Sequence, residues 1–334
     1  MSVNGKMSKF AYNCTSMKKE DLKIVFLGTP EFAVESLSRL YNEGYNIAGV
    51  ITMPDKPAGR GHKMLQSPVK QFAVEHGLKL MQPTNLKAPE FIEELRSLDA
   101  DLFIVIAFRM LPEAVWTMPR LGTFNLHASL LPKYRGAAPL NWAVINGDKE
   151  TGVTTFFLKH EIDTGDIIDQ KRVAINPDDN VGDIHDRLMM LGADLTLETV
   201  RHIIDGNLKT IEQDKLTGGV DPTPAPKIFK ETCLIDWNNN AEKVHNLVRG
   251  LSPYPAAWTT LTTASGDELQ LKIFKTSVSG QTTLAPGSIV IDKDRMYIAC
   301  NDRLLEILSL QLQGKKRLDT ADFLRGFNPD NFKL

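Results

Sequence analysis

The sequence has little cysteine and no long apolar run, and both absences limit the possible classes of protein. Cys14, Cys233 and Cys300 are the only cysteines among 334 residues and lie far apart, which indicates free thiols and argues against a disulfide framework or a zinc site. Eighteen consecutive apolar residues occur nowhere, and residues 1–20 lack the apolar stretch of a secretory signal. We therefore expect a cytoplasmic protein, monomeric, with no membrane partner and no metal.

Strong charge of either sign is also missing. The chain has 39 Lys and Arg residues against 41 Asp and Glu residues, a formal net charge of -2. Whole-protein charge thus gives no argument for binding a polyanion such as nucleic acid. A balanced chain can nevertheless carry a local basic groove, so nucleic-acid binding is not excluded.

The first two thirds of the chain alternate between β-rich runs and helical patterns. This alternation predicts a doubly wound, mostly parallel sheet of the Rossmann-like kind, which binds ligands beyond the carboxyl ends of its strands. Residues 54–67 are too rich in Pro, Gly and positive charge for a regular element. The strands are expected at 22–28, 46–52, 101–108, 123–129 and 152–158, and the helices at 30–44, 68–77, 89–99 and 179–206.

The last third has a different pattern. A helical stretch at 241–251 precedes five short β-like runs separated by turn signals, which predict a small β-barrel of the OB-like kind. A chain of this length suggests two domains. We expect a disordered extension at 1–20, a first domain at 21–206, a linker at 207–227 and a C-terminal domain at 228–334.

Asn125 and His127 are the strongest candidates for chemistry. They are two residues apart at the end of an expected strand, so their side chains share one face. A lone Asn-x-His pair is more often structural, but Asp163 ends the next strand in a polar segment and could approach it. A carboxylate orients the imidazole, and an amide can donate to a developing oxyanion. These groups suit direct attack by an amine on an acyl carbon, without a covalent intermediate.

The same residues carry a resemblance to a known family. Asn125-x-His127, the following Ser129–Pro132 segment, Tyr134-Arg135-Gly136 and the Asp163 segment resemble the 10-formyltetrahydrofolate-dependent formyltransferases. The resemblance runs from about residue 22 to the C-terminus. Three further passages are similar to the members of this family that act on methionyl-tRNA: LGTPEFAV (27–34), PDKPAGRG (54–61) and LSPYPAAW (251–258).

The resemblance implies an activity and a set of roles. The enzyme would transfer the formyl group of 10-formyltetrahydrofolate to the free α-amino group of initiator methionyl-tRNA, with Asn125, His127 and Asp163 as catalytic residues. Residues 21–206 would be the catalytic domain and 228–334 a tRNA-binding domain. The folate site would comprise Phe108, Arg109, Met110, Leu111, Ser129, Leu130, Leu131 and Pro132. The tRNA contacts would be Arg60, Lys272, Lys275, Lys315, Lys316 and Arg317.

Arg109 departs from the pattern of many members, which have glycine at this position. Its side chain must therefore point away from the pterin or contact the acidic tail of the folate.

Three other functions compete with this interpretation. A formyltransferase acting on a nucleotide-linked amino sugar would share the passage around His127, but the 54–61 and 251–258 segments favour tRNA. A dinucleotide-dependent oxidoreductase would need a G-x-G-x-x-G turn, whereas the first turn, from residue 28, reads Gly-Thr-Pro-Glu-Phe. A non-catalytic RNA-binding protein would leave the Asn125, His127 and Asp163 set without a purpose.

Overall fold

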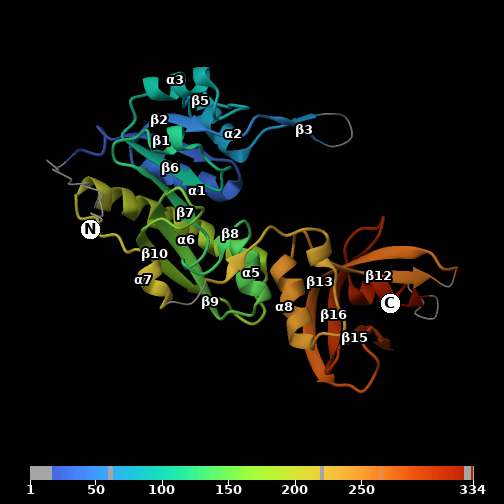
Figure 1. Cartoon of the computed structure of the whole chain (residues 1–334). Coiled ribbons are helices and arrows are strands. Elements are labelled where there is room, and N and C mark those ends of the chain that lie inside the picture. The colour runs from blue at the N-terminus through green and yellow to red at the C-terminus, as the bar shows by residue number, and fades with distance from the viewer. Residues whose placement is uncertain (1–16, 59–62, 219–221, 264, 327–331, 334) are drawn as a thin grey trace, which may run out of the picture. The chain divides into compact units, whose positions relative to one another are not determined.

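The computed structural model describes residues 17–58, 63–218, 222–263, 265–326 and 332–333 (Figure 1). The chain forms two compact units. One comprises residues 1–127, 154–170 and 189–215, and the other residues 128–153, 171–188 and 216–334. Each unit is therefore built from several separate stretches of the chain.

A seven-stranded, mostly parallel sheet is the framework of the first unit, and this confirms the predicted fold class. The strand order is β10-β9-β7-β6-β1-β2-β5, and β9 pairs antiparallel with β7. The strands are β1 (Lys23–Gly28), β2 (Asn46–Ile51), β5 (Leu80–Met81), β6 (Leu102–Ile106), β7 (Thr123–His127), β9 (Glu150–Phe157) and β10 (Ile167–Ala174).

Helices cover both faces of this sheet because its central strands are apolar on both sides. Every residue of β6 is buried, as expected for a strand between two layers of helices. One face packs against α3 and α4, and the other against α1 and α6, where Gly192 of α6 allows close approach to Leu126 of β7. The helices are α1 (Glu31–Asn42), α2 (Pro68–Glu75), α3 (Pro89–Ser97), α4 (Glu113–Trp116), α6 (Val181–Ile204) and α7 (Asp214–Thr217).

The expectation that residues 54–67 contain no regular element was wrong. β3 (Lys56–Ala58) and β4 (Lys63–Leu65) pair antiparallel, so the segment forms a short two-stranded ribbon. Pro57 is tolerated because a two-stranded ribbon consists only of edge strands. Residues 59–62 between the strands, and 1–16 of the expected extension, lie outside the described residues.

The second unit combines a helix pair with an antiparallel sheet. α5 (Pro139–Ile145) packs on α8 (Ala241–Leu251), and Asn141 Nδ2 donates to the Gly250 carbonyl at 2.8 Å. β8 (Arg135–Gly136) pairs with β11 (Pro224–Ala225), which falls in the stretch expected to be a linker. Between β11 and α8 lies a short 3₁₀ helix, η1 (Glu231–Cys233).

The sheet of the second unit is antiparallel and confirms that the C-terminal domain is a β domain. Its order is β14-β15-β16-β13-β12-β18, with β17 beside β16, and α8 packs its apolar side against it. The elements are β12 (Ala257–Thr263), β13 (Glu268–Gln281), β14 (Ile289–Asp292), β15 (Arg295–Ala299), β16 (Arg303–Leu312), β17 (Leu318–Asp319), α9 (Thr320–Leu324) and β18 (Phe332–Lys333).

Gly165 gives a test of the packing beside the sheet. A Cβ atom at this position would lie 1.6 Å from the Phe157 carbonyl oxygen, so a side chain requires backbone movement. We expect Gly165→Ala to lower the free energy of unfolding by about 3 kcal/mol, measured by denaturant titration. Gly280→Ala is the matched control, because a Cβ atom there would have no described atom within 4 Å. Equal stability of the two variants would contradict this account.

Candidate active site

Asn125 and His127 are among the last three residues of β7. Asn125 pairs with Val105 of β6 and with Phe156 of β9, and His127 pairs with Thr154 of β9. Both side chains therefore lie on the sheet face that α3 and α4 cover, opposite α6. The site is thus placed at the carboxyl end of a strand in the middle of the sheet, where this class of fold binds ligands.

Buried neighbours restrain the imidazole of His127. The residue is only 6% exposed, and its ring meets the Phe156 ring edge to face at a centroid separation of 6.3 Å. Its cross-strand partner Thr154 is fully buried and accepts a hydrogen bond from Gln170 Nε2 at 2.9 Å. A side chain packed in this way cannot turn freely, so the orientation of its ring nitrogens is determined by the fold.

Asp163 lies opposite that imidazole. Its Oδ2 is 3.9 Å from His127 Nδ1, and its side chain is 14% exposed. The distance is within ion-pair reach and exceeds a hydrogen bond by about 1 Å, as is common for catalytic pairs in the absence of substrate. Asp163 has φ of 54°, in the left-handed region that Asp tolerates better than most residues.

The loop that carries Asp163 is held in place by Gln213. The Gln213 amide is buried and donates to the carbonyl oxygens of Asp163 at 2.9 Å and of Gly165 at 2.8 Å. The Phe157 N–H also donates to the Asp166 carbonyl at 3.1 Å. These bonds hold both ends of the 163–166 segment against β9, so the carboxylate is presented to His127 by a rigid loop.

The set can assist acyl transfer. A carboxylate beside Nδ1 can orient the imidazole, which leaves Nε2 able to exchange a proton with substrate. The amide of Asn125, on the same strand face, can donate to an oxyanion. Within the described part of the chain, no group of three or more His, Cys, Asp or Glu side chains could hold a metal ion.

The structure settles where the Arg109 side chain points. Its Nη1 donates to the Thr84 carbonyl at 2.9 Å, its Nη2 donates to the Pro83 carbonyl, and its guanidinium lies 5.7 Å from the Phe108 ring centroid. Burial lowers the pKa of this guanidinium. The side chain is thus bound back onto the segment after β5, so the backbone of 108–111 is not covered by it. In the same stretch Met110 is 75% exposed and Leu111 is buried.

The Ser129–Pro132 segment forms a tight turn in the second unit. Ser129 is fully buried, and its hydroxyl donates to the Lys133 carbonyl at 2.7 Å. Leu131 is also buried, and the Leu131–Pro132 peptide is cis. The turn therefore has a defined shape that depends on the Ser129 hydroxyl.

A β-bulge brings together two of the lysines expected to contact tRNA. On β13, Lys272 pairs with Gln311 and Lys275 pairs with Ser309 of β16, with Phe274 as the extra residue. Gln311 and Ser309 are two residues apart on β16, so Lys272 and Lys275 share a face although they are three apart. Arg317 joins this face through its Nε, which donates to Ser309 Oγ at 2.9 Å.

The remaining expected contacts are less informative. Lys315 and Lys316 are exposed in the turn after β16. Arg60 lies outside the described residues.

Two family models match successive parts of the chain. The formyl transferase model matches residues 22–200, and the formyl transferase C-terminal domain model matches residues 227–328. The chain belongs to the formyl transferase family.

Relatives within this family cover nearly the whole chain. It is 60% identical over 321 residues to the methionyl-tRNA formyltransferase of Bacteroides fragilis, covering 95% of this chain and 99% of the relative. It is 58% identical to that of Bacteroides thetaiotaomicron, over 95% of this chain and 100% of the relative. The match to that of Porphyromonas gingivalis is 48% over 93% of this chain and 97% of the relative.

Solved structures of formyl transferase folds are more distant. An N-formyltransferase from Helicobacter canadensis, in complex with folinic acid and dTDP-3-aminofucose, aligns with a TM-score of 0.64 at 20% identity, covering 86% of this chain and 98% of the other. HypX from Aquifex aeolicus aligns with a TM-score of 0.61 at 17% identity. The alignment covers 91% of this chain and 49% of HypX, so the chain spans about half of that protein. At such identities the likeness concerns the fold alone.

No helix in the described residues is both long and apolar enough to cross a membrane.

Gln213 was not found by sequence reasoning, because it lies in the stretch expected to be a linker. Nothing in the local pattern distinguishes a glutamine in a polar segment from one that is buried under a catalytic loop. Its signal is three-dimensional: the two carbonyl oxygens that accept its amide protons are about fifty residues away in the chain.

The role of Gln213 in this formyl transferase can be tested directly. We expect Gln213→Ala to lower kcat by about tenfold, because the Asp163 loop loses two hydrogen bonds and the carboxylate no longer holds its position. KM should change little. The measurement is steady-state formylation, with thermal melting to show that the variant is folded. Thr164→Ala is the control, since it removes only a local hydrogen bond to the Glu161 carbonyl. An unchanged kcat in Gln213→Ala would rule out the positioning role.

Proposed function

We propose that this chain transfers the formyl group of 10-formyltetrahydrofolate to the α-amino group of initiator methionyl-tRNA. One observation carries the proposal: relatives named methionyl-tRNA formyltransferase are 60% identical over almost the full length of both chains. The Asn125, His127 and Asp163 set supports the chemical step. The cytoplasmic location and the monomeric state expected from the sequence remain predictions that belong to this proposal.

The proposed reaction is direct transfer between two nitrogen atoms. The neutral α-amino group attacks the formyl carbon, a new C–N bond forms, and the carbonyl oxygen becomes an oxyanion that the Asn125 amide stabilises by donating a hydrogen bond. The bond from carbon to N10 of the folate then breaks, and N10 takes a proton. His127 carries the proton from the attacking amine toward N10, and Asp163 stabilises the imidazolium formed on the way.

Folate binding is assigned to two backbone segments. In the first, from Phe108 to Leu111, the Arg109 side chain is turned onto the 83–84 carbonyls, so peptide groups remain available to a pterin ring. In the second, Ser129 to Pro132 form a turn whose shape the Ser129 hydroxyl maintains. Fixed backbone donors and acceptors suit a flat heterocycle with many polar edges.

The face of the C-terminal sheet that carries Lys272, Lys275 and Arg317 is assigned to the tRNA. The bulge at Phe274 gathers these cations although the chain as a whole is nearly neutral. Lys315 and Lys316 lie in the turn after β16, directly before Arg317, and are assigned to the tRNA as well. Arg60 keeps the role of a tRNA contact that the family resemblance implies. An amino-sugar substrate is disfavoured because this chain is only 15–22% identical in sequence to the sugar N-formyltransferases of solved structure.

The acceptor and the catalytic role of His127 can be tested together. Incubation with 10-formyltetrahydrofolate should formylate methionyl-tRNA and leave a nucleotide-linked amino sugar unmodified, as measured by mass spectrometry. His127→Ala should lower the rate by roughly 10²–10⁴ because proton transfer is lost. The variant should melt close to wild type. Turnover of the amino sugar alone would overturn the proposed acceptor, and near-normal turnover by His127→Ala would overturn the proposed role.

Salt dependence provides a separate test of RNA binding. If three phosphates are contacted, affinity for methionyl-tRNA should fall roughly fortyfold between about 50 and about 200 mM salt, because bound counterions are released on association. The measurement is filter binding or fluorescence anisotropy at several salt concentrations. The affinity for the folate, whose charge is small, serves as the control. A flat response with tRNA would contradict a phosphate-binding face.

A further inference from the structure

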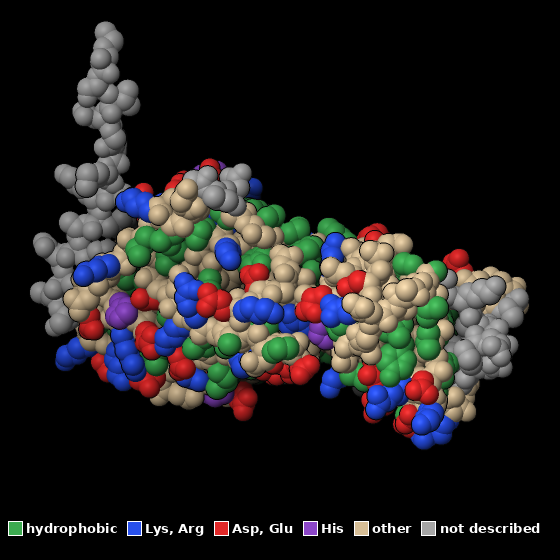
Figure 2. All heavy atoms as spheres, turned by 90° about the horizontal axis from the view of Figure 1, so that it is seen from below, with side chains coloured by type: hydrophobic (Ala, Val, Ile, Leu, Met, Phe, Trp, Pro, Cys, Tyr) green, Lys and Arg blue, Asp and Glu red, His purple; other side chains and the backbone are tan. Residues whose placement is uncertain are grey.

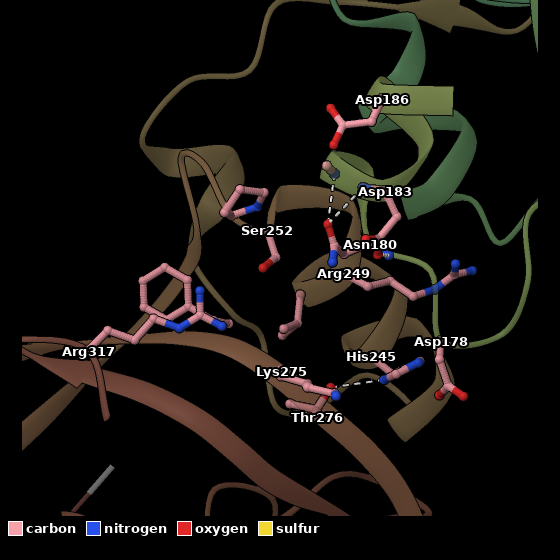
Figure 3. Close-up of a pocket in the computed structure, with 14 residues that line it drawn as sticks. Asp178, Asn180, Asp183, Asp186, His245, Arg249, Ser252, Lys275, Thr276 and Arg317 are labelled. Carbon is pink, nitrogen blue, oxygen red and sulfur yellow. Dashed lines mark hydrogen bonds between the residues drawn. The ribbon is translucent and has the colours of Figure 1, made fainter. Parts of the chain in front are cut away.

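A cavity of about 510 Å³ opens in the second unit beside the first turns of α6 (Figure 3). Val248, Pro253 and Phe274 give it an apolar lining, and Ser252 and Thr276 add buried hydroxyl groups. This size is within the range of pockets that enclose a small organic molecule. The catalytic trio does not line it, so it is a separate site.

Side chains of both charges line this cavity, among them Asp178 before α6 and Arg249 of α8. Figure 3 shows Lys275 and Arg317 on the side of the C-terminal sheet and Asp183 and Asp186 on the side of α6. The Asp183 carboxylate already accepts from the Asn180 N–H at 2.9 Å at the start of α6. An anionic group of a ligand is therefore best placed beside Lys275 and Arg317, away from Asp183 and Asp186.

The two cations on the sheet side are available to a ligand. Lys275 is exposed and has no ion pair with any residue that the structure describes. The Arg317 guanidinium is held flat, 4.4 Å from the Phe274 ring centroid, while its Nε donates to Ser309. Only Nε is occupied within the described chain, so both Nη groups remain free to donate. A guanidinium fixed in this way is suited to a phosphate or to stacking on a base.

Arg249 supplies a buried charge on the cavity wall. It is 6% exposed, its Nε donates to Asn246 Oδ1 at 2.7 Å, and its Nη1 donates to the Asp179 carbonyl at 3.1 Å. Burial lowers the pKa of this guanidinium. Among the described residues no carboxylate forms an ion pair with it, and Nη2 has no acceptor. This Nη2 can donate to an acceptor on a ligand in the cavity.

We propose that this cavity receives one nucleotide of the bound tRNA; the proposal rests on the function proposed above. A nucleotide matches the lining in three respects. Its phosphate suits Lys275 and Arg317, its base presents a flat surface to Pro253, and its polar edges combine donors for the carboxylates with acceptors for Arg249. The lining does not suit an entirely apolar ligand, because charged side chains lie on more than one side of it.

The test compares two cationic side chains inside the cavity with one outside it. Lys275→Ala and Arg317→Ala should each raise KM for methionyl-tRNA by about tenfold, leave kcat within about twofold, and lower the salt slope of binding by about one. Lys243→Ala removes one positive charge from the exposed side of α8, outside the cavity, and should behave as wild type. Hydroxyl-radical probing of the bound tRNA should show one ribose that wild type and Lys243→Ala protect. The same ribose should be exposed when either cavity variant is bound.

Each other outcome counts against the proposal in a distinct way. If Lys275→Ala and Arg317→Ala match Lys243→Ala while wild type formylates methionyl-tRNA, the cavity proposal fails, and the assignment of these two cations to the tRNA fails with it. The proposed reaction and its acceptor stand. If wild type neither binds nor formylates methionyl-tRNA, the proposed function fails as well. Adenosine monophosphate alone is the second probe, and it should compete weakly with tRNA. Tight binding that does not compete would assign the cavity to a free nucleotide and overturn the tRNA version.

Discussion

The candidate site depends on the hydrogen bonds that Gln213 donates to the Asp163 and Gly165 carbonyls. Together with the bond from the Phe157 N–H to the Asp166 carbonyl, they hold the segment after β9 in place and so support the 3.9 Å separation of Asp163 Oδ2 from His127 Nδ1. The adjoining Gly165 fits only because it has no side chain. A buried amide and a missing Cβ thus hold a carboxylate against an imidazole, which is the geometry that proton transfer needs.

Strand pairing supplies the other half of the site. Asn125 and His127 share a face because they are two residues apart on a strand, and the neighbouring strands fill the same face with Val105 and Phe156. An apolar surrounding restrains the buried imidazole of His127, and it strengthens the hydrogen bonds that the partly buried Asn125 amide can donate. The opposite face of β7 is closed by α6 through Leu126 and Gly192. Polar chemistry is thereby confined to one side of the sheet.

The sequence was informative wherever a short-range pattern determines the structure. β6 was predictable because five consecutive apolar residues have few alternatives to a central strand, and the carboxyl-end rule then directed attention to Asn125 and His127. β3 and β4 were missed because Pro, Gly and Lys are poor strand formers, and their pairing depends on each other. β10, at 167–174, was missed because its polar residues Asp169, Gln170, Lys171 and Arg172 interrupt the apolar pattern. Gln213 and the Phe274 bulge depend on contacts with distant residues, which no local pattern records.

The bulge also explains how a nearly neutral protein could bind an acidic polymer. On the face in view in Figure 2, Lys and Arg side chains are interspersed with Asp and Glu, in agreement with the net charge of -2. Binding of RNA therefore needs a local device that separates the signs. An extra residue in β13 places Lys272 and Lys275 on one face, and Ser309 fixes Arg317 beside them. Three cations gathered on one face of the sheet can contact successive phosphates, whereas the same three dispersed over the surface would be offset by neighbouring carboxylates. Local geometry, more than total charge, would then decide which polymer this sheet recognises.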